Sequence, residues 1–383
     1  MIYLDHNSTT PVDKRVLDAM LPFFTEVYGN AASIDHDPGH DANKAVNVAR
    51  NQIARLIGAK DEEIIFTSGA TESDNIALFG VAEKYANSGN HIITSKTEHK
   101  AVLDSCHKLE SKGFDITYLD VDSFGRVSID AVRDAITSKT ILVSIMYANN
   151  EIGTIAPVRE IGALTRERGI IFHTDATQAV GHVPINVDEC NIDLMSMSAH
   201  KMYGPKGVGG LFVRRRIPRV RVAPVIYGGG HEKGIRSGTL NVPGIVGFGT
   251  AAEIARNAMH DEKTQYLSYS KLFLDVIQSR VGEVFINGSM TERLPNNLNI
   301  SVPGIESKSL VVQLKGIAIS TGSACTSSSV EPSHVITALG HGAERAHSAI
   351  RIGWGRFTTT DEVERAASII CDAIQRVRAL NLR

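Results

Sequence analysis

The chain has 383 residues, 43% of them hydrophobic, and a formal net charge of −2 at neutral pH. This length exceeds what one hydrophobic core usually supports, so the sequence predicts two domains. The small net charge gives no global field that would attract nucleic acid or an anionic membrane, which leaves small molecules and proteins as the expected partners. No segment is apolar enough to cross a bilayer and the first residues do not form a secretion signal, so we expect a soluble protein that is not exported.

The four cysteines indicate the compartment. They lie far apart, form no CxxC pair and show no zinc-finger spacing with histidine: Cys106, Cys190, Cys325 and Cys371. Such usage is typical of a reducing compartment, so we expect a cytoplasmic protein with no metal site.

From about residue 60, short β-rich runs alternate with amphipathic helical stretches, a pattern typical of βα units and a largely parallel sheet. The predicted strands, in chain order, are 64–69, 91–95, 115–120, 140–147, 169–176, 193–200 and 208–213. The predicted helices between them include 70–86, 98–113 and 157–169. The sequence therefore predicts an α/β domain with a mainly parallel seven-stranded sheet between helices.

After about residue 240 the pattern changes to a long helical tract and then to shorter strands at 295–302 and 347–354, mixed with helices. A capping box at Thr359 and Glu362 begins the last helix. One buried stripe is predicted on that helix, formed by Val363, Ala366, Ala367, Ile370, Ile374 and Val377. We therefore expect a large cofactor-binding α/β domain over residues 14–255, and a small α+β domain over residues 1–13 and 256–383.

Lys201 is the first candidate for chemistry. The segment SAHK follows the predicted strand 193–200, and ligands of open α/β sheets bind at the carboxyl ends of strands. A lysine at that place can form an imine with an aldehyde. The alternative is a surface lysine beside a turn.

Asp175 directly follows the core of the predicted strand 169–176 and would lie at the same edge of the sheet. A buried carboxylate opposite a pyridinium nitrogen keeps that nitrogen protonated and makes the ring an electron sink. The alternative for Asp175 is a helix N-cap before Ala176. Gln178 is either a surface residue near this cap or a donor to a phenolic oxygen of the cofactor.

A phosphate site is indicated where the strand 64–69 passes through Gly69 into the helix that begins at Ala70. Free backbone N–H groups and the Thr71 hydroxyl can face an anion there, and Ser198 and His200 can complete the site. A capped helix without a ligand is the alternative. The chain has no Walker A motif, and the GxGxxA match at 247–252 lies inside a helical pattern, so we do not interpret it as a dinucleotide site.

Cys325 lies in STGSACTSSSVEPS, a run of small and hydroxyl residues that is typical of a mobile loop with an exposed thiol. Cys106 and Cys371 lie in helical patterns and are expected to be inert core residues. A basic run from Arg214 to Arg221 is interpreted as a solvated strand end, with a face for an acidic partner as the alternative.

Seven segments together resemble the cysteine desulfurases of the NifS and IscS type. They are TSGATESDN, TSKTEHKAVLD, VSIMYANNEIG, HTDATQ, SAHKMYGPKG, GGGHEKGIRSGT and STGSACTSSSVEPS. The resemblance implies a fold-type I enzyme, similar to aspartate aminotransferase, that uses pyridoxal 5'-phosphate and forms a homodimer. One departure is Ala31, where the family generally has proline.

The resemblance also implies a role for each matching residue. Lys201 would form the Schiff base, Asp175 would face the pyridine nitrogen and His99 would lie over the ring. Arg351 would bind the substrate carboxylate, with Asn150 near both substrate and cofactor; an ion pair with Asp or Glu is the alternative for Arg351. The remaining matches are cofactor contacts: Ala70, Thr71, Gln178, Ser198, His200 and, from the other subunit, Thr239.

The activity implied is conversion of L-cysteine to L-alanine, with Cys325 taking the sulfur as a persulfide and His99 moving a proton at that sulfur. An acceptor protein of unknown identity would then receive the sulfur, for iron-sulfur cluster assembly, tRNA thiolation or DNA sulfur modification. Two alternatives remain: a selenocysteine lyase or another β-eliminating or transaminating enzyme of the same fold, and an inactive scaffold protein.

Overall fold

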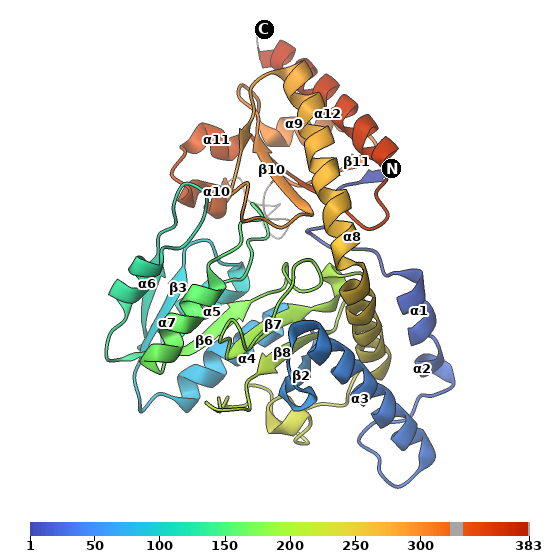
Figure 1. Ribbon diagram of the computed structural model, residues 1–383, viewed down its shortest axis with the longest axis vertical. Coiled ribbons are helices and arrows are strands. Elements are labelled where there is room, and N and C mark those ends of the chain that lie inside the picture. Colours follow the sequence, from blue (N-terminus) through green and yellow to red (C-terminus); the bar gives the residue numbers. More distant parts are fainter. Residues whose placement is uncertain (322–331, 382–383) are drawn as a thin grey trace.

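The computed structural model describes residues 1–321 and 332–381, and its centre is a seven-stranded sheet (Figure 1). The strand order is β2-β8-β7-β6-β5-β3-β4, and only β8 runs antiparallel to its neighbours within this sheet. The strands are β2 (Ile64–Thr67), β3 (His91–Ser95), β4 (Asp115–Leu119), β5 (Thr140–Ser144), β6 (Ile171–Asp175), β7 (Leu194–Ser198) and β8 (Gly209–Val213). Each coincides with a predicted strand, so the predicted fold class is confirmed.

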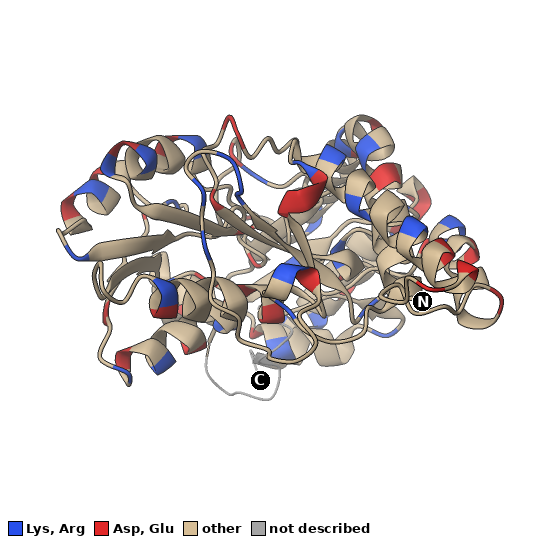
Figure 2. Cartoon of the chain, turned by 90° about the horizontal axis from the view of Figure 1, so that it is seen from below, with Lys and Arg blue, Asp and Glu red and all other residues tan. Residues whose placement is uncertain are grey.

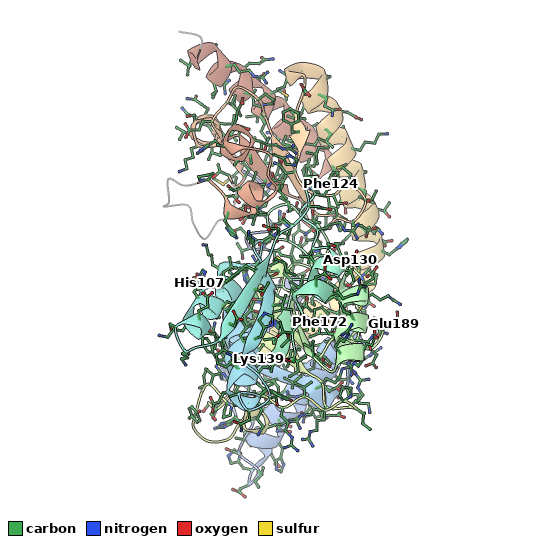
Figure 3. All side chains as sticks on the ribbon, turned by 90° about the vertical axis from the view of Figure 1, so that its left-hand side faces the viewer. His107, Phe124, Asp130, Lys139, Phe172 and Glu189 are labelled. Atoms are coloured by element: carbon green, nitrogen blue, oxygen red, sulfur yellow. The ribbon has the colours of Figure 1, made fainter. Side chains whose placement is uncertain are left out.

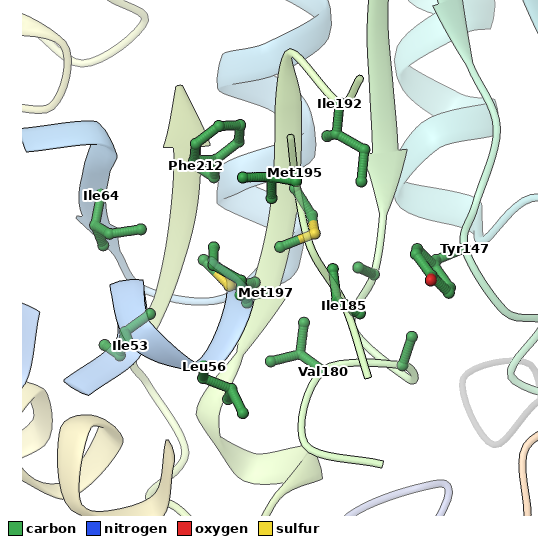
Figure 4. Packing of buried hydrophobic residues seen from close by; sticks show 14 of the residues in the cluster. Ile53, Leu56, Ile64, Tyr147, Val180, Ile185, Ile192, Met195, Met197 and Phe212 are labelled. Carbon is green, nitrogen blue, oxygen red and sulfur yellow. The ribbon is translucent and has the colours of Figure 1, made fainter. Parts of the chain in front are cut away.

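Both faces of the sheet are covered, so nearly all strand residues outside the edge strand β4 are buried. Alternate residues face opposite sides: Phe172 belongs to one core cluster and its neighbour Ile171 to another. One face packs on α4 (Ala70–Lys84) and α5 (Lys100–Glu110). Figure 4 shows the other face, where strand residues such as Met195, Met197 and Phe212 meet α3 (Asp37–Ile57). Figure 3 shows Phe172 inside this part of the molecule and Glu189 at its outer edge.

A second core lies around β10 (Asn297–Ser301), which pairs antiparallel with β9 (Phe285–Ile286) and β12 (Ala349–Gly353). It packs against α12 (Thr360–Asn381), whose predicted stripe is buried. The predicted capping box is present, because Thr359 N donates to Glu362 Oε2 at 3.0 Å and Glu362 N donates to Thr359 Oγ1 at 3.3 Å. Both predictions for the last helix are confirmed.

One helix, α8 (Val242–Val281), joins the two cores. Its first residues, up to Ala255, belong to the core of the seven-stranded sheet, and residues from Tyr266 onward belong to the second core. The chain's first residues also reach the second core, through Ile2 and Leu4. The predicted domain boundary after residue 255 falls inside α8, and the division into domains stays a prediction.

The other described elements are short connections and coverings. They are β1 (Ile2–Tyr3), α1 (Lys14–Met20), α2 (Pro22–Thr25), η1 (Asp61–Glu63), α6 (Ile129–Ala135), α7 (Val158–Arg168), η2 (Ala199–Lys201), η3 (Glu232–Gly234), α9 (Ser307–Gln313), β11 (Ile317–Ala318), α10 (His334–Ala338) and α11 (Ala343–His347).

Charged residues lie mainly on the outer helices and loops, whereas the sheet itself carries few (Figure 2). Within the basic run, Arg214 is buried and pairs with Asp188 at 2.7 Å, and Arg216 pairs with Glu63 at 2.8 Å. These two arginines therefore stabilise the end of β8 and are not a solvated surface. No helix among the described residues is long and apolar enough to cross a membrane.

Candidate active site

A cavity of about 410 Å³ lies at the carboxyl ends of β6 and β7, beside the start of α4. Among its lining residues are most of the predicted site residues: Ala70, Thr71, His99, Asn150, Asp175, Gln178, Ser198, His200, Lys201 and Arg351. Thr239 is exposed and does not line it, and Cys325 lies outside the described residues. A larger hollow of about 840 Å³ along α3 is lined by none of the predicted residues.

Lys201 enters this cavity from the short 3₁₀ turn η2, directly after β7. Its Nζ donates hydrogen bonds to the backbone carbonyls of Asn7, at 2.8 Å, and Ser8, at 2.6 Å. A surface lysine beside a turn would not be held in this way. The amine is therefore fixed at the wall of a cavity, as a covalent attachment point requires.

Asp175 is the last residue of β6 and is 5% exposed. Its Oδ1 accepts the N–H of Thr177 at 2.9 Å, so one carboxylate oxygen caps the following turn, although no helix begins at Ala176. Gln178 is also buried, and its Nε2 donates to the Asn7 carbonyl at 2.8 Å. The surface alternative for Gln178 is thereby excluded.

The start of α4 has the features of an anion site. Gly69 precedes the helix with φ of 154°, a conformation that side chains rarely adopt, and a Cβ on Gly209 would lie 2.6 Å from the Gly69 Cα. Two glycines therefore allow the turn to expose the backbone N–H groups of a helix N-terminus. Ser198, His200 and the exposed Lys206 also line this cavity.

The His200 side chain lies near two cations, Lys201 and Lys206. Its Nδ1 lies 3.0 Å from Thr9 Oγ1, and burial, together with the nearby Lys201 and Lys206 cations, lowers its pKa to about 4. An anion bound at this place would oppose both cations and favour the protonated imidazole.

His99 is the N-cap of α5, where its Nδ1 accepts the N–H of Ala101 at 3.2 Å. A neutral His99 therefore carries its proton on Nε2, because the acceptor nitrogen must be unprotonated. The ring can present that proton to a group in the cavity it lines.

Arg351 forms the ion pair that was the alternative for it, and it also lines the cavity. It is buried on β12 and lines the cavity, and its guanidinium donates to Asp5 Oδ1 at 2.8 Å and to the Asn150 carbonyl at 2.8 Å. Its Nε has no partner among the described residues. The guanidinium is thus paired on one side and retains donor capacity.

A layer of buried acids lies behind the cavity wall. Glu98 accepts hydrogen bonds from Ser95 and from the Met146 N–H, and burial raises its pKa to about 8. Burial, and then the charge of Asp175, raises the pKa of Asp74 well above its usual range. His173 lies 3.6 Å from Asp74, and burial lowers its pKa to about 4. Asp74 and Glu98 are therefore held as neutral acids beside Asp175.

Several lining residues were not predicted. Asn7 and Ser8 act through backbone carbonyls, which no side-chain pattern identifies, and Thr177 has a buried hydroxyl without a partner among the described residues. Lys206, by contrast, follows the predicted strand 193–200 within the glycine-rich stretch YGPKGVGG and could have been found from that position.

Comparison with known proteins relates this site to a family. The profile described as Aminotransferase class-V matches residues 2–366. The chain belongs to the class-V aminotransferase family. Cysteine desulfurase IscS of Rickettsia akari (strain Hartford) is 52% identical over 381 residues, covering 99% of this chain and 92% of that one.

Solved structures agree with this relationship. A NifS-like protein superposes with a TM-score of 0.91 at 37% identity, over 98% of this chain and 99% of that chain. SspA in complex with cysteine has a TM-score of 0.83 at 37% identity, over 94% of this chain and all of that chain. The predicted resemblance to NifS and IscS enzymes, and pyridoxal 5'-phosphate as the cofactor of this class-V aminotransferase, are confirmed.

Replacing Glu98 with Gln should change how stability depends on pH. In the wild type the raised pKa means that the folded protein keeps a proton that the unfolded chain releases between pH 4.5 and about 8. The free energy of unfolding then falls as pH rises through this window, by up to about 1.4 kcal/mol per pH unit. Glu98→Gln lacks this loss, so its stability relative to wild type should increase from pH 5 to pH 8.

Urea unfolding midpoints at several pH values measure the effect. Glu364→Gln, at an exposed position of α12, is the matched control and should show a constant difference from wild type. A constant difference for Glu98→Gln as well would contradict the neutral state of Glu98.

Proposed function

We propose that this class-V aminotransferase is a cysteine desulfurase that converts L-cysteine to L-alanine and takes the sulfur onto Cys325. The observation that supports this best is the convergence of an amine, a carboxylate, an imidazole and a guanidinium on one cavity at the carboxyl edge of the sheet. The larger hollow along α3 also has these four groups, in Lys44, Glu253, His40 and Arg55, but its lining comes from α3, the residues before it and α8, and from no strand end. Lys201 in the cavity also argues against an inactive scaffold.

The residues of the cavity fit the cofactor. Lys201 would hold its aldehyde, Asp175 its ring nitrogen and the start of α4 its phosphate, with Ser198 and His200; the buried Thr177 hydroxyl has room for a further partner. When bound, pyridoxal phosphate supplies an aldehyde that reacts with amines and a ring that accepts negative charge. Of the buried acids Asp74, Glu98 and Asp175, only Asp175 lines the cavity.

The chain's own groups then position the substrate and move its protons. Arg351 binds the substrate carboxylate through its planar guanidinium, whose orientation Asp5 fixes. The Lys201 amine removes the proton from the α-carbon, since the Asn7 and Ser8 carbonyls hold it at the cavity wall. His99 moves a proton at the substrate sulfur through Nε2.

Cys325 supplies the nucleophile. Its thiolate bonds to the substrate sulfur while the bond from that sulfur to Cβ breaks, which leaves a persulfide on Cys325 and, after protonation of the carbon, alanine. The buried cysteines are poor substitutes; burial raises the pKa of Cys106 to about 12 and also raises that of Cys371.

We further propose a homodimer. Exposed large apolar side chains on the first two helices and the turn after them, Leu17, Leu21, Phe24 and Tyr28, support an interface there. Thr239 is exposed outside its own cavity, in keeping with a contact to the site of a second copy. The sulfur would pass to an acceptor protein in the cytoplasm, in iron-sulfur cluster assembly, tRNA thiolation or DNA sulfur modification.

Two substitutions separate the roles of amine and thiol. Lys201→Ala should abolish alanine formation, because the cofactor loses its covalent attachment. The base that removes the proton from the α-carbon is lost as well. Cys325→Ser should keep the yellow cofactor and form no protein persulfide. Absorption spectra, alanine assays and mass spectrometry after incubation with cysteine measure these outcomes.

Cys371→Ala serves as the control, because it removes a buried thiol of the second core and should leave the persulfide on Cys325. Sulfur found on Cys106 or Cys371 in the wild type would contradict the assignment. Cys325→Ala that keeps most of its activity with selenocysteine would favour a selenocysteine lyase.

Arg351→Lys should raise KM for cysteine by about 10- to 150-fold, because hydrogen bonds to a charged group contribute roughly 1.5–3 kcal/mol. Lysine keeps the charge but loses the paired donors. Steady-state kinetics with dithiothreitol as sulfur acceptor give KM. The matched control is Arg345→Lys, a residue bonded to Asn287 outside the cavity, which should leave KM unchanged. An unaltered KM in Arg351→Lys would contradict a role in substrate binding and leave Arg351 with its partners in the fold, Asp5, Asn150 and Ser320.

A further inference from the structure

Tyr203, two residues after Lys201, has an unusual backbone for a buried tyrosine. Its φ is 68°, in the left-handed region, and its side chain is almost fully buried. That conformation costs a residue other than glycine about 1–3 kcal/mol and persists only where its surroundings fix it. The segment that carries Lys201 is therefore held against a local preference.

The backbone around Lys201 is fixed at several points. The Lys201 carbonyl lies 3.0 Å from His182 Nε2, and the Tyr203 N–H donates to Thr10 Oγ1 at 2.8 Å. The Tyr203 carbonyl accepts the N–H of Asp13 at 3.0 Å. Residues 7–13 thus contact both the amine of Lys201 and the backbone that follows it.

The Tyr203 side chain belongs to a closed ring of hydrogen bonds. Its hydroxyl accepts the backbone N–H of Arg356 and lies 3.5 Å from the Tyr266 hydroxyl. Tyr266 donates to Glu262 Oε2 at 3.3 Å, and the Arg356 Nε donates to the other oxygen of Glu262. Burial raises the pKa of Tyr203 to about 12, so its hydroxyl stays protonated.

Arg356 connects this ring to the N-terminal segment. Its guanidinium lies over the Tyr203 ring, 4.2 Å from the centroid, and its Nη1 donates to Asp13 Oδ2 at 3.0 Å. Both charges are buried, with side-chain exposures of 9% for Arg356 and 3% for Asp13. A buried ion pair costs desolvation free energy, so it is weak evidence for stability alone and better evidence for fixing one arrangement.

We propose that Tyr203 and Arg356 are positioning residues that set where the Lys201 amine enters the cavity. Neither residue lines the cavity. The ring joins the loop after η2, α8 and the segment after β12, so it links the second core to the attachment lysine. The role of Lys201 rests on the proposed function.

The test uses the holoenzyme and Tyr203→Phe, which keeps the aromatic ring and removes only the hydroxyl, together with Arg356→Met. The first readout is the pH titration of the visible absorption band of the bound cofactor, which reports the surroundings of the Lys201 nitrogen. The second is the split between kcat and KM for cysteine. Both variants should shift the titration midpoint by at least 0.5 pH unit and lower kcat about 10-fold or more, with KM within about two-fold, since misplacing a reacting group by about 1 Å can cost about 100-fold.

Arg214→Met is the matched control, because Arg214 is another buried, ion-paired arginine at the far end of β8. It should lower thermal stability without moving the band or kcat. If Tyr203→Phe keeps the wild-type titration midpoint and the wild-type kcat, the proposal is overturned, even if Arg356→Met fails to fold. Shifts of the same size in Arg214→Met would also overturn it. The titration does not require turnover. If the wild type binds the cofactor but releases no alanine, the desulfurase activity is refuted, and the titration still tests the positioning of Lys201.

Discussion

The amine of Lys201 is held by the backbone carbonyls of Asn7 and Ser8, almost two hundred residues earlier in the chain. The proposed site depends on this contact, because it holds the amine that we propose as the attachment point of the cofactor between the sheet and the N-terminal segment. That segment begins in the second core through Ile2 and Leu4, then passes the cavity and ends at the cap of α1. Its path therefore connects the second core with the wall of the cavity.

Electrostatics divide the cavity into regions. The α4 N-terminus, Lys201 and Lys206 form a positive region suited to an anion, whereas Asp175 lies in front of a buried acid layer. Because Asp74 and Glu98 have raised pKa values, that layer adds little negative charge at neutral pH. The positive region would suit the phosphate of a ring-and-phosphate ligand, and Asp175 would suit its ring nitrogen.

Much of this could be predicted from the sequence. The strands were identifiable because short β-rich runs alternate with amphipathic helical stretches; Asp175 and Lys201 were identifiable because each comes at a strand's carboxyl end. Asn7 and Ser8 could not be predicted, since they act through backbone carbonyls and depend on how the N-terminal segment folds back. The ion pair of Arg351 was expected only as an alternative to substrate binding, and the structure shows this ion pair in a residue that also lines the cavity.

The basic run from Arg214 to Arg221 shows what could not be predicted from the sequence. Its charges were interpreted as a solvated strand end, and Arg219 and Arg221 are indeed exposed. Arg214, however, pairs with Asp188 in the segment before β7, and Arg216 pairs with Asp188 and with Glu63 in the turn before β2. Local sequence gave no sign of these partners, which lie far away along the chain. A charged side chain needs either an ion-pair partner or contact with water, and only the folded structure shows which of the two each arginine has.

Borohydride reduction of the cofactor-loaded enzyme, followed by peptide mapping, tests most directly whether Lys201 is the attachment point. Hydride converts the carbon–nitrogen double bond into a stable amine, so the account predicts a single pyridoxyl group on the peptide that contains Lys201. A pyridoxyl group on Lys206 or another lysine, or none on any lysine of a protein that retains its visible absorption band, would contradict it.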